Sequence, residues 1–511
     1  MVSTDRGADS RMRVLHAAAE VFPLLKTGGL ADVVGALPAV LKEQGADVRL
    51  ILPGVPAILD GVLDLAEMVC VGPAFGAAQL TLRRGRMPGS DLTAYVLDAP
   101  WLFDRPGNPY LAPNGIEWGD NHRRFAAFGW AAAHLAFGEF DRDWRADILH
   151  CHDWHSGLAP AFLRSNPACK VRTVFTIHNL AFQGHFPLEV FRELALPASI
   201  LNAEGLEFHG NGSFMKAGLV FADSLTTVSP RYAQEIRTPE FGSGLEGVLR
   251  ARGNKLCGIL NGVDYKIWDP QTDRLLPANY SPHALEGKAV CKADLQAATG
   301  LDTNPETPLF AVVSRLADQK GTDLVLAALP ALLRLGGQLI VLGSGERYLQ
   351  DALEAAARAN PRSVRVQLGY DEAMAHRMVA AADVILVPSR FEPCGLTQLY
   401  GLRYGTLPLV RRVGGLADTV VDADAPAGEA DASSVARGPA SASTPTGFVF
   451  DRPTPLALED TVARAIAVHA DKPRWRQMMQ NAMLRDYSWA ASAAQYRELY
   501  QALLAPVDPA R

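Results

Sequence analysis

Residues 12–53 read MRVLHAAAEVFPLLKTGGLADVVGALPAVLKEQGADVRLILP, and this stretch decides the fold class. Two short apolar runs, at 12–19 and 48–53, have the length and composition of buried strands. Between them the apolar residues recur at helical spacing, at Leu30, Val33, Val34, Leu37, Val40 and Leu41. A strand, a helix and a second strand in this order predict a βαβ unit, and therefore a parallel sheet with a right-handed crossover.

The same alternation of apolar runs and helical stretches continues through both halves of the chain. In the first half, strands are expected at 147–151, 171–177 and 224–228; in the second half, at 309–314, 338–343, 364–369, 383–389 and 407–410. With 511 residues, the chain exceeds the roughly 250 to 300 at which a single core stops growing. We therefore predict an α/β protein made of two Rossmann-like, doubly wound domains.

Composition and charge limit the classes of partner that the chain could bind and the compartment in which it could work. The formal net charge of −6 argues against broad binding to nucleic acid or to acidic membranes. No apolar run reaches the roughly 18 to 20 residues of a membrane span. The six cysteines form no CxxC pair, and the first eleven residues are polar, without the apolar segment of a secretory signal. We expect a cytoplasmic protein.

The sequence KTGGL at 26–30 stands between the first strand and its helix. Ligands of parallel sheets sit outside the carboxyl ends of the strands, so this loop is a candidate site. Gly28 and Gly29 would let the backbone approach a phosphate, and Lys26 would add a positive charge. A tight turn with a solvated lysine explains this motif alone equally well.

The sequence SRLADQKG at 314–321 takes the corresponding place in the second half. It puts Arg315 and Lys320 in one loop between an expected strand and the next helix. Two cations beside a helix start suit a diphosphate, with Arg able to bind it through two nitrogens. A solvated basic loop without a ligand is the alternative, and we disfavour it because the other domain carries a similar loop with a cation and glycines.

The sequence FEPCGLTQLYGL at 391–402 follows another buried strand. Glu392 at the strand's end could accept hydrogen bonds from sugar hydroxyls, while the backbone of Gly395, Leu396 and Thr397 could bind phosphate. The alternative for Glu392 is a carboxylate that stabilises a helix start. Cys394 beside it could be a nucleophile, but no base accompanies it.

Histidines gather after two strands of the first half. His150, His152 and His155 surround Asp153 in the sequence ILHCHDWHSG, which raises the question of a metal site. We disfavour zinc because no second ligand cluster is visible. In TIHNLAFQG at 176–184, the pair His178 and Asn179 is placed for contact with a sugar; capping the turn after the strand is an equal alternative.

Taken together, LLKTGGLADV, HCHDWHSGLAP, TIHNLAFQG, NGSFMKAGL, NGVD, SRLADQKG and FEPCGLTQLYGLRYGTLPLVRRVGGLADTV resemble the bacterial glycogen synthase and plant starch synthase family. The match runs in order over nearly the whole chain. It implies the glycosyltransferase B fold, in which two Rossmann-like domains face a cleft. It also implies transfer of glucose from ADP-glucose to the non-reducing end of an α-1,4-glucan such as glycogen or a maltooligosaccharide, with retention of configuration and without a metal ion or other cofactor.

The resemblance also implies roles for individual residues. His178, Glu392, Arg315, Lys320 and Asp153 would be catalytic: two hold the glucose, two neutralise the diphosphate and Asp153 stands at the acceptor side. The remaining contacts to substrate would come from Lys26, Gly28, Gly29, Asn179, Asn261, Tyr370, Cys394, Gly395, Leu396 and Thr397. Among these, Tyr370 would lie near the adenine.

We expect an N-terminal domain at 1–258, a nucleotide-sugar domain at 259–485 and a final helical segment at 486–511 that returns to the first domain. The stretch 422–446, rich in Ala, Ser and Pro, is predicted to be a disordered loop, longer than the family needs. Because the two phosphate-type loops belong to different domains, we also expect domain rotation about hinges near 255–262 and 473–490.

Three other functions remain open from the sequence. A hydride-transfer enzyme is disfavoured because neither first strand-to-helix turn carries GxGxxG with a following acidic residue. A glucan phosphorylase would need pyridoxal phosphate, which a coloured preparation would reveal. A non-catalytic glucan-binding protein would have no need to retain Lys26, Arg315, Lys320 and Glu392 together.

Overall fold

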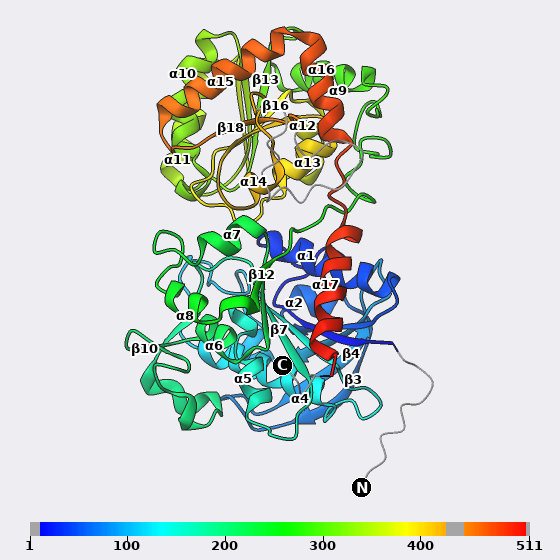
Figure 1. The fold of residues 1–511 in the computed structure, drawn as a ribbon, viewed down its shortest axis with the longest axis vertical. Coiled ribbons are helices and arrows are strands. Elements are labelled where there is room, and N and C mark those ends of the chain that lie inside the picture. The colour runs from blue at the N-terminus through cyan, green and yellow to red at the C-terminus, as the bar shows by residue number, and fades with distance from the viewer. Residues whose placement is uncertain (1–10, 426–443, 507–511) are drawn as a thin grey trace. The chain divides into compact units, whose positions relative to one another are not determined.

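The computed structural model describes residues 11–425 and 444–506 (Figure 1). The chain divides into two compact units. Unit 1 holds residues up to Val228, Ala233–Ile259 and the end of the chain from Trp489; unit 2 holds Ser229–Tyr232 and Leu260–Ser488. The main crossings between the units therefore fall at 259/260 and 488/489, where the sequence-based division had them after 258 and 485.

Unit 1 is built on a nine-stranded sheet with the order β12-β11-β7-β6-β1-β2-β5-β4-β3. The strands from β12 to β5 are parallel, and β4 and β3 run antiparallel at one edge. These strands are β1 (Arg13–Ala17), β2 (Asp47–Pro53), β3 (Leu63–Val71), β4 (Leu80–Arg86), β5 (Thr93–Asp98), β6 (Ile148–His152), β7 (Arg172–Ile177), β11 (Ser224–Thr227) and β12 (Leu256–Gly258). A small second sheet joins β8 (His185–Pro187), β10 (Asn211–Ser213) and β9 (Glu207–Phe208).

The helices of unit 1 bury the faces that the sequence pattern marks as apolar. They are α1 (Gly29–Glu43), α2 (Pro56–Gly61), α3 (Pro100–Phe103), α4 (Asn121–Phe137), α5 (Ala159–Arg164), α6 (Phe214–Phe221), α8 (Glu246–Ala251) and α17 (Trp489–Leu504). On α1, Leu30, Val33 and Leu37 are buried, as the helical spacing predicts. The last helix, α17, packs against α1, as Figure 1 shows.

Unit 2 contains a six-stranded parallel sheet with the order β15-β14-β13-β16-β17-β18. Its strands are β13 (Leu309–Val313), β14 (Gln338–Gly343), β15 (Val364–Leu368), β16 (Val384–Val387), β17 (Leu407–Arg411) and β18 (Phe448–Phe450). Its helices are α9 (Glu286–Thr299), α10 (Thr322–Arg334), α11 (Arg347–Ala359), α12 (Glu372–Ala381), α13 (Thr397–Arg403), α14 (Gly414–Thr419), α15 (Pro455–Ala470) and α16 (Lys472–Met483). A further helix, α7 (Pro230–Glu235), belongs to both units, because the chain passes from unit 2 back to unit 1 between Tyr232 and Ala233.

The sequence-based strands are confirmed in both units, within one or two residues at their ends. The antiparallel strands β3 and β4 and the neighbouring β5 were missed. β3 lies at the edge of the sheet and has mostly exposed or half-exposed residues, so it lacks the apolar run that marks the central strands. The predicted loop at 422–446 lies largely outside the described residues, at 426–443.

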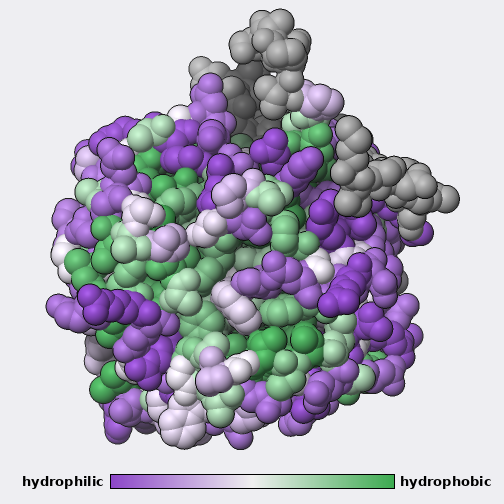
Figure 2. Space-filling model, turned by 90° about the horizontal axis from the view of Figure 1, so that it is seen from below, coloured by the Kyte–Doolittle hydropathy of each residue, from purple (hydrophilic) through white to green (hydrophobic). Residues whose placement is uncertain are grey.

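The surface of the described residues mixes polar and apolar side chains. Figure 2 shows one face with hydrophobic residues in its middle and hydrophilic residues around them. Large apolar side chains that stay exposed in unit 1 include Trp101 (71% exposed) and Ile116 (66% exposed). None of the described helices combines the length and the apolar character needed to cross a membrane.

Candidate active site

The order of the strands in unit 2 locates its site. The chain adds β14 and β15 on one side of β13, and β16, β17 and β18 on the other. The connections that follow β13 and β16 therefore lead to opposite sides of the sheet, and such a change of direction is where parallel sheets bind ligands. The sequences SRLADQKG and FEPCGLTQ are these two loops.

The loop after β13 is shaped by Gly321, which precedes α10. Its φ is +70°, in the left-handed region, and a Cβ there would overlap the carbonyl oxygen of Pro388. Glycine is therefore required at this position on both counts. The two predicted cations lie upstream: Lys320 is partly buried, whereas Arg315 is exposed and donates from Nη2 to Oε1 of Gln319, 3.2 Å away.

Lys320 and Glu392 join the loop after β13 to the loop after β16. Nζ of Lys320 donates to Oε2 of Glu392 at 2.5 Å, and Oγ of Ser389 donates to the same oxygen at 2.9 Å. The Glu392 side chain is 8% exposed and that of Lys320 is 19% exposed. Burial and the two hydrogen bonds hold an ammonium and a carboxylate at one point, which is the geometry needed to bind neighbouring anionic and hydroxyl groups of one ligand.

The residues after Glu392 form the turn into α13. Gly395 has a φ of +75°, and Leu396 precedes the first helical residue, Thr397, whose hydroxyl donates to the carbonyl of Val313 at 3.4 Å. This contact joins the start of α13 to the end of β13. Burial raises the pKa of the Cys394 thiol to about 12, so the thiol stays protonated and is a poor nucleophile.

Two further predicted contacts in unit 2 differ in exposure. Tyr370, which follows β15, is 71% exposed, and its hydroxyl contacts Glu372. Asn261 is buried, and its Oδ1 has no hydrogen-bond partner among the described residues. A buried amide oxygen without a partner is costly unless a ligand or water supplies a donor, so Asn261 has the character of a binding residue.

Unit 1 has its own change of direction, between β1 and β6. From β1 the chain adds β2 and β5 on one side, and β6, β7, β11 and β12 on the other. The loops after β1, β6 and β7 carry KTGGL, Asp153 and the pair His178–Asn179. The residues that the sequence singled out in this half therefore share one edge of one sheet.

The KTGGL loop is organised by a residue that the sequence analysis missed, Glu20. This carboxylate is 3% exposed and accepts hydrogen bonds from the amide of Thr27 at 2.5 Å, the hydroxyl of Thr27 at 2.6 Å, the amide of Gly28 at 3.3 Å and the hydroxyl of Tyr110 at 2.6 Å. Glu20 thus occupies the amide of Thr27 and the amide of Gly28, whose backbone we expected to approach a phosphate. The signal that could have found it is an acidic residue six positions before a Gly-rich loop, which is too common to be informative.

What the loop offers to a ligand is therefore the cation and open space. Nζ of Lys26 donates to Oδ1 of Asp32 at 2.9 Å, and the lysine side chain is 28% exposed. At Gly28, φ is −162°, an extended conformation open to any residue, and a Cβ would have no atom within 4 Å. Neither the backbone nor the neighbouring atoms require glycine at 28, which suits a position that a ligand approaches. Gly29 begins α1.

Asp153 stands at the end of β6 in a strained conformation. Its φ of +59° with ψ of −180° is a combination that glycine adopts and other residues avoid. The residue is 7% exposed, and its Oδ1 has no hydrogen-bond partner among the described residues. Burial raises the pKa of this carboxyl well above its usual value, and the amides of Trp154 and Asn179 oppose the shift. Strain and burial at a strand end make Asp153 a candidate functional residue.

Next to it, the pair His178 and Asn179 is half-buried. Oδ1 of Asn179 accepts from the amide of Ala181 at 3.1 Å, which is the turn-capping alternative. The Nε2 atom of His178 is hydrogen-bonded to Nδ1 of His152, 3.0 Å away. His178 thus belongs to a buried histidine cluster that includes His16, a residue that the sequence analysis also missed because it is 136 positions from its partner His152.

The structure thus assembles the predicted residues into two groups, each within its own unit. Unit 2 brings together Arg315, Lys320, Glu392 and Thr397 in the loops after β13 and β16, with Tyr370 after the edge strand β15. Unit 1 brings together the loops that carry Lys26, Asp153 and His178. His155 takes another role, with its ring stacked on Tyr110 at 5.5 Å.

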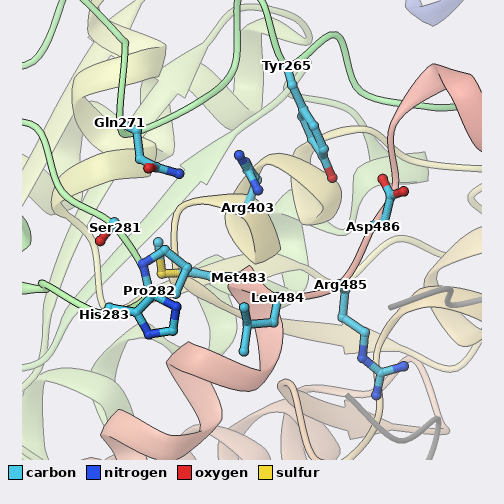
Figure 3. Close-up of a pocket in the computed structure, with 10 residues that line it drawn as sticks. All are labelled: Tyr265, Gln271, Ser281, Pro282, His283, Arg403, Met483, Leu484, Arg485 and Asp486. Carbon is cyan, nitrogen blue, oxygen red and sulfur yellow. The ribbon is translucent and has the colours of Figure 1, made fainter. Parts of the chain in front are cut away.

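A separate hollow in unit 2 contains none of the predicted site residues. It has a volume of about 350 Å³ and lies where α13 and α16 end. Figure 3 shows the guanidinium of Arg403 between Gln271 and Tyr265, with Asp486 beyond Tyr265. Arg403 is already paired with Asp269 at 2.6 Å, so the hollow presents no unpaired charge of its own at Arg403. The strand-end loops remain the better candidate.

Comparison with known proteins identifies the family of the chain. Residues 13–251 match the family described as the starch synthase catalytic domain, and residues 298–482 match glycosyl transferases group 1. The glycogen synthase of Variovorax paradoxus (strain S110) is 52% identical over 503 residues, covering 96% of this chain and 99% of the relative. That of Serratia proteamaculans (strain 568) is 53% identical over 496 residues, covering 96% of this chain and all of the relative.

Solved structures give the same result for the fold. The catalytic domain of starch synthase IV from Arabidopsis thaliana, bound to ADP and acarbose, is similar with a TM-score of 0.86 and 32% identity, over 97% of this chain and 100% of that one. A sucrose-phosphate synthase from Thermosynechococcus elongatus shares the fold alone, with a TM-score of 0.58 and 19% identity. The predicted glycosyltransferase B fold is confirmed, and the chain belongs to the glycogen synthase family.

Proposed function

We propose that this chain transfers glucose from ADP-glucose to the non-reducing end of an α-1,4-glucan, with retention of configuration and release of ADP. The observation that carries the proposal is the Lys320–Glu392 pair at the change of strand direction in unit 2. A nucleotide sugar needs a cation for its diphosphate next to an acceptor for its sugar hydroxyls, and these two side chains are joined at that point. Membership of the family supports the same activity.

The donor half of the reaction belongs to unit 2. When ADP leaves, negative charge grows on the diphosphate and positive charge on the anomeric carbon. Lys320 and Arg315 stabilise that leaving group more in the transition state than in the ground state, which is the requirement for catalysis. Glu392 accepts hydrogen bonds from the glucose, Thr397 and the backbone from Cys394 to Leu396 contact the phosphates, Asn261 contacts the sugar and phosphate, and Tyr370 offers its exposed ring to the adenine.

Unit 1 supplies the remaining groups. His178 and Asn179 bind glucose hydroxyls, Asp153 stands at the acceptor side, and Lys26 contacts the nucleotide sugar through the open space at Gly28. We propose attack on the face from which ADP leaves: the bond between the anomeric carbon and the diphosphate oxygen breaks, the acceptor oxygen bonds to that carbon, and the acceptor's proton passes to the departing phosphate. No carboxylate nucleophile takes part, unlike in retaining glycosidases.

We further propose that the reaction needs no metal ion and takes place in the cytoplasm. Lys320 and Arg315 provide the positive charge that a metal ion supplies in other phosphate-transfer sites. The six cysteines are all unpaired, which suits a reducing compartment. Treating the protein with EDTA and assaying in EDTA should leave the transfer rate within about twofold of the untreated enzyme. A loss that Mg²⁺ or Mn²⁺ restores would contradict this part of the proposal.

The central test is incorporation of labelled glucose into glycogen from ADP-glucose and, in parallel, from UDP-glucose. Strong incorporation from ADP-glucose is expected, and Lys320→Ala and Glu392→Ala should each lower kcat by about 10²- to 10³-fold, as removal of one transition-state contact does. Arg347→Ala, whose side chain is 93% exposed in the described structure, is the control and should keep full activity. Cleavage of the new bond by an α-1,4-specific glucosidase would report retention.

The opposite result has a definite meaning. A folded protein that binds glycogen and transfers glucose from neither donor would be a glucan-binding module, and the proposed enzyme activity would be wrong. Equal incorporation from both donors would keep the enzyme and contradict the choice of ADP-glucose.

A further inference from the structure

Behind the predicted sugar contact His178 lies a row of buried imidazoles. Nδ1 of His16, on β1, is 2.9 Å from Nε2 of His152, at the end of β6. Nδ1 of His152 is in turn 3.0 Å from Nε2 of His178, after β7. His16 and His152 have no exposed surface, and His178 is half-buried. Hydrogen bonds therefore connect the core of the sheet to a residue at its ligand-binding edge.

Two of these histidines lie close enough to a third buried histidine, His150, to suggest a metal site. His16, His150 and His152 each offer a nitrogen within 4.8 Å of the others. However, both nitrogens of His150 are hydrogen-bonded, to the hydroxyls of Tyr500 and Thr176 at 2.6 Å each. Both nitrogens of His152 are also occupied, so a metal would have to break existing bonds. The cluster is better described as two hydrogen-bonded rows, with His150 outside the row that reaches His178.

The row allows only two proton arrangements when its rings are neutral. A neutral imidazole carries one proton, so each ring donates at one nitrogen and accepts at the other. If His152 donates to His178, then His16 donates to His152, and all three rings are protonated on Nδ1. If His178 donates to His152, all three are protonated on Nε2. Burial lowers the pKa of His16 and of His178 to about 3 and that of His152 well below its usual value, so the neutral condition is met.

The outer end of the row is where this order matters. Within the described residues, Nδ1 of His178 makes no hydrogen bond, and it is the ring nitrogen left for a ligand. In one arrangement it is a donor, and in the other an acceptor. At the inner end of the row, Nε2 of His16 is buried and has no hydrogen-bond partner among the described residues. What His178 offers to a sugar hydroxyl is thus decided by its partners in the core.

We propose that His152, backed by His16, is a positioning residue that fixes the ring orientation and the tautomer of His178, so that Nδ1 of His178 meets a sugar hydroxyl with one defined hydrogen-bonding role. The proposal rests on the proposed function for its sugar ligand. His152 itself touches no substrate in this scheme and acts only through His178.

The first test reads the tautomers directly. The full chain is labelled with ¹⁵N-histidine, and the imidazole signals are assigned by single substitutions; protonated and unprotonated ring nitrogens resonate far apart. We expect His16, His152 and His178 to carry their protons on the same nitrogen, each in a single tautomer. A mixed pattern, or His178 averaging between tautomers, would overturn the proposal, and this readout is independent of any enzymatic activity.

The second test uses substitutions with a matched control. His152→Leu should leave His178 with mixed tautomers and lower kcat/KM for the donor sugar about tenfold, the worth of one hydrogen bond. His152→Asn keeps an amide near the place of Nδ1 and should restore one tautomer and most of the activity. His150→Leu is the control: its ring is as buried and stacks on His152 at 4.2 Å, but it is outside the row.

The control separates positioning from stability. His150→Leu should lower the melting temperature and leave both the His178 tautomer and the kcat/KM of the folded enzyme unchanged. If His150→Leu and His152→Leu impair activity equally, or if His152→Leu leaves His178 in its original tautomer, the positioning role is wrong. Failure of the unsubstituted chain to transfer glucose would refute the proposed function instead, while the tautomer pattern would still decide the order of the row.

Discussion

At the scale of single residues, Gly28 offers a way to separate ligand binding from folding. Its extended backbone accepts any residue, and a Cβ would meet no atom within 4 Å. Gly28→Ala should therefore leave the melting temperature unchanged or slightly raised, because alanine reduces the freedom of the unfolded chain. If a ligand approaches this backbone closely, the added methyl group should lower kcat/KM about 10- to 100-fold.

The measurement compares donor-concentration curves and thermal melts of the two proteins. Gly247→Ala on α8, where a Cβ also meets nothing, serves as the control and should keep normal kinetics. Normal kinetics in Gly28→Ala as well would mean that no substrate approaches this loop closely.

The buried histidines predict a stability that depends on pH. Burial lowers the pKa of His16, His155 and His178 to about 3 in the folded protein, against 6.5 in the unfolded chain. Between these values the unfolded chain binds protons that the folded chain does not, so unfolding becomes easier as the pH falls below 6.5, by about 1.4 kcal/mol per pH unit for each histidine. Asp153, whose pKa is raised by burial, works in the opposite sense.

His16→Leu isolates one histidine from this sum. The variant's free energy of unfolding for unit 1, measured with urea between pH 7 and 5, should fall less steeply than that of the unsubstituted chain, by the contribution of one residue. Replacing the exposed His283 in unit 2 by alanine should leave the slope unchanged. Parallel curves for His16→Leu and the unsubstituted chain would show that His16 does not resist protonation in the fold.

At the scale of elements, the turn from β6 into the short helix η1 (Trp154–Ser156) stores strain at Asp153. Glycine tolerates the observed φ and ψ, whereas other residues lose about 1 to 3 kcal/mol there. Asp153→Gly should therefore be more stable than Asp153→Ala by roughly that amount in urea unfolding. Both variants should lose transfer activity, because both lack the carboxyl that we place at the acceptor side.

Two outcomes would contradict this account of the turn. Equal stability of Asp153→Gly and Asp153→Ala would mean that the turn relaxes without strain. Full activity in Asp153→Gly would mean that the carboxyl has no part in the reaction, and that the strained backbone needs another explanation.

Some elements could be predicted from the sequence, and others could not. Most of the parallel strands were predictable because apolar runs between helical stretches mark strands that are buried on both faces, and the loops after them carried Lys320, Glu392 and His178. The parallel strand β5 was missed although most of its residues are buried. β3 was not predictable because an edge strand with exposed residues has no such run. Glu20 and His16 could not be identified as site residues from the sequence, because their roles come from contacts that only the folded sheet creates and that no local sequence pattern indicates.

At the scale of the whole molecule, unit 1 is completed by the last helix of the chain. α17 packs on α1, from which it is separated by the whole of unit 2 in sequence. Its Trp489, Tyr496 and Tyr500 are 3%, 1% and 0% exposed. Tyr500 also contacts Nδ1 of His150 at 2.6 Å. Unit 1 therefore cannot bury its full core until the ribosome has finished unit 2.

This order of synthesis leads to a prediction about truncation. A chain that ends at Ser488 retains all of unit 2 and lacks α17, so two melting transitions should move differently. Removing three buried aromatic side chains, each worth about 1.5 to 3 kcal/mol, should lower the transition of unit 1 by many degrees or abolish it. The transition of unit 2 should stay where it is, because every residue from Leu260 to Ser488 is still present.

The matched control is a chain that ends at Leu504, which keeps α17 whole and should melt like the full chain. Calorimetry of the three proteins distinguishes the cases, with ADP added to identify the transition of unit 2, which we propose binds the nucleotide, by its upward shift. If the chain that ends at Ser488 kept the transition of unit 1 unchanged, α17 would be an attachment to a core already complete. If both transitions fell together, the two units would unfold as one, and the loss of a single terminal helix would destabilise the proposed donor site as well.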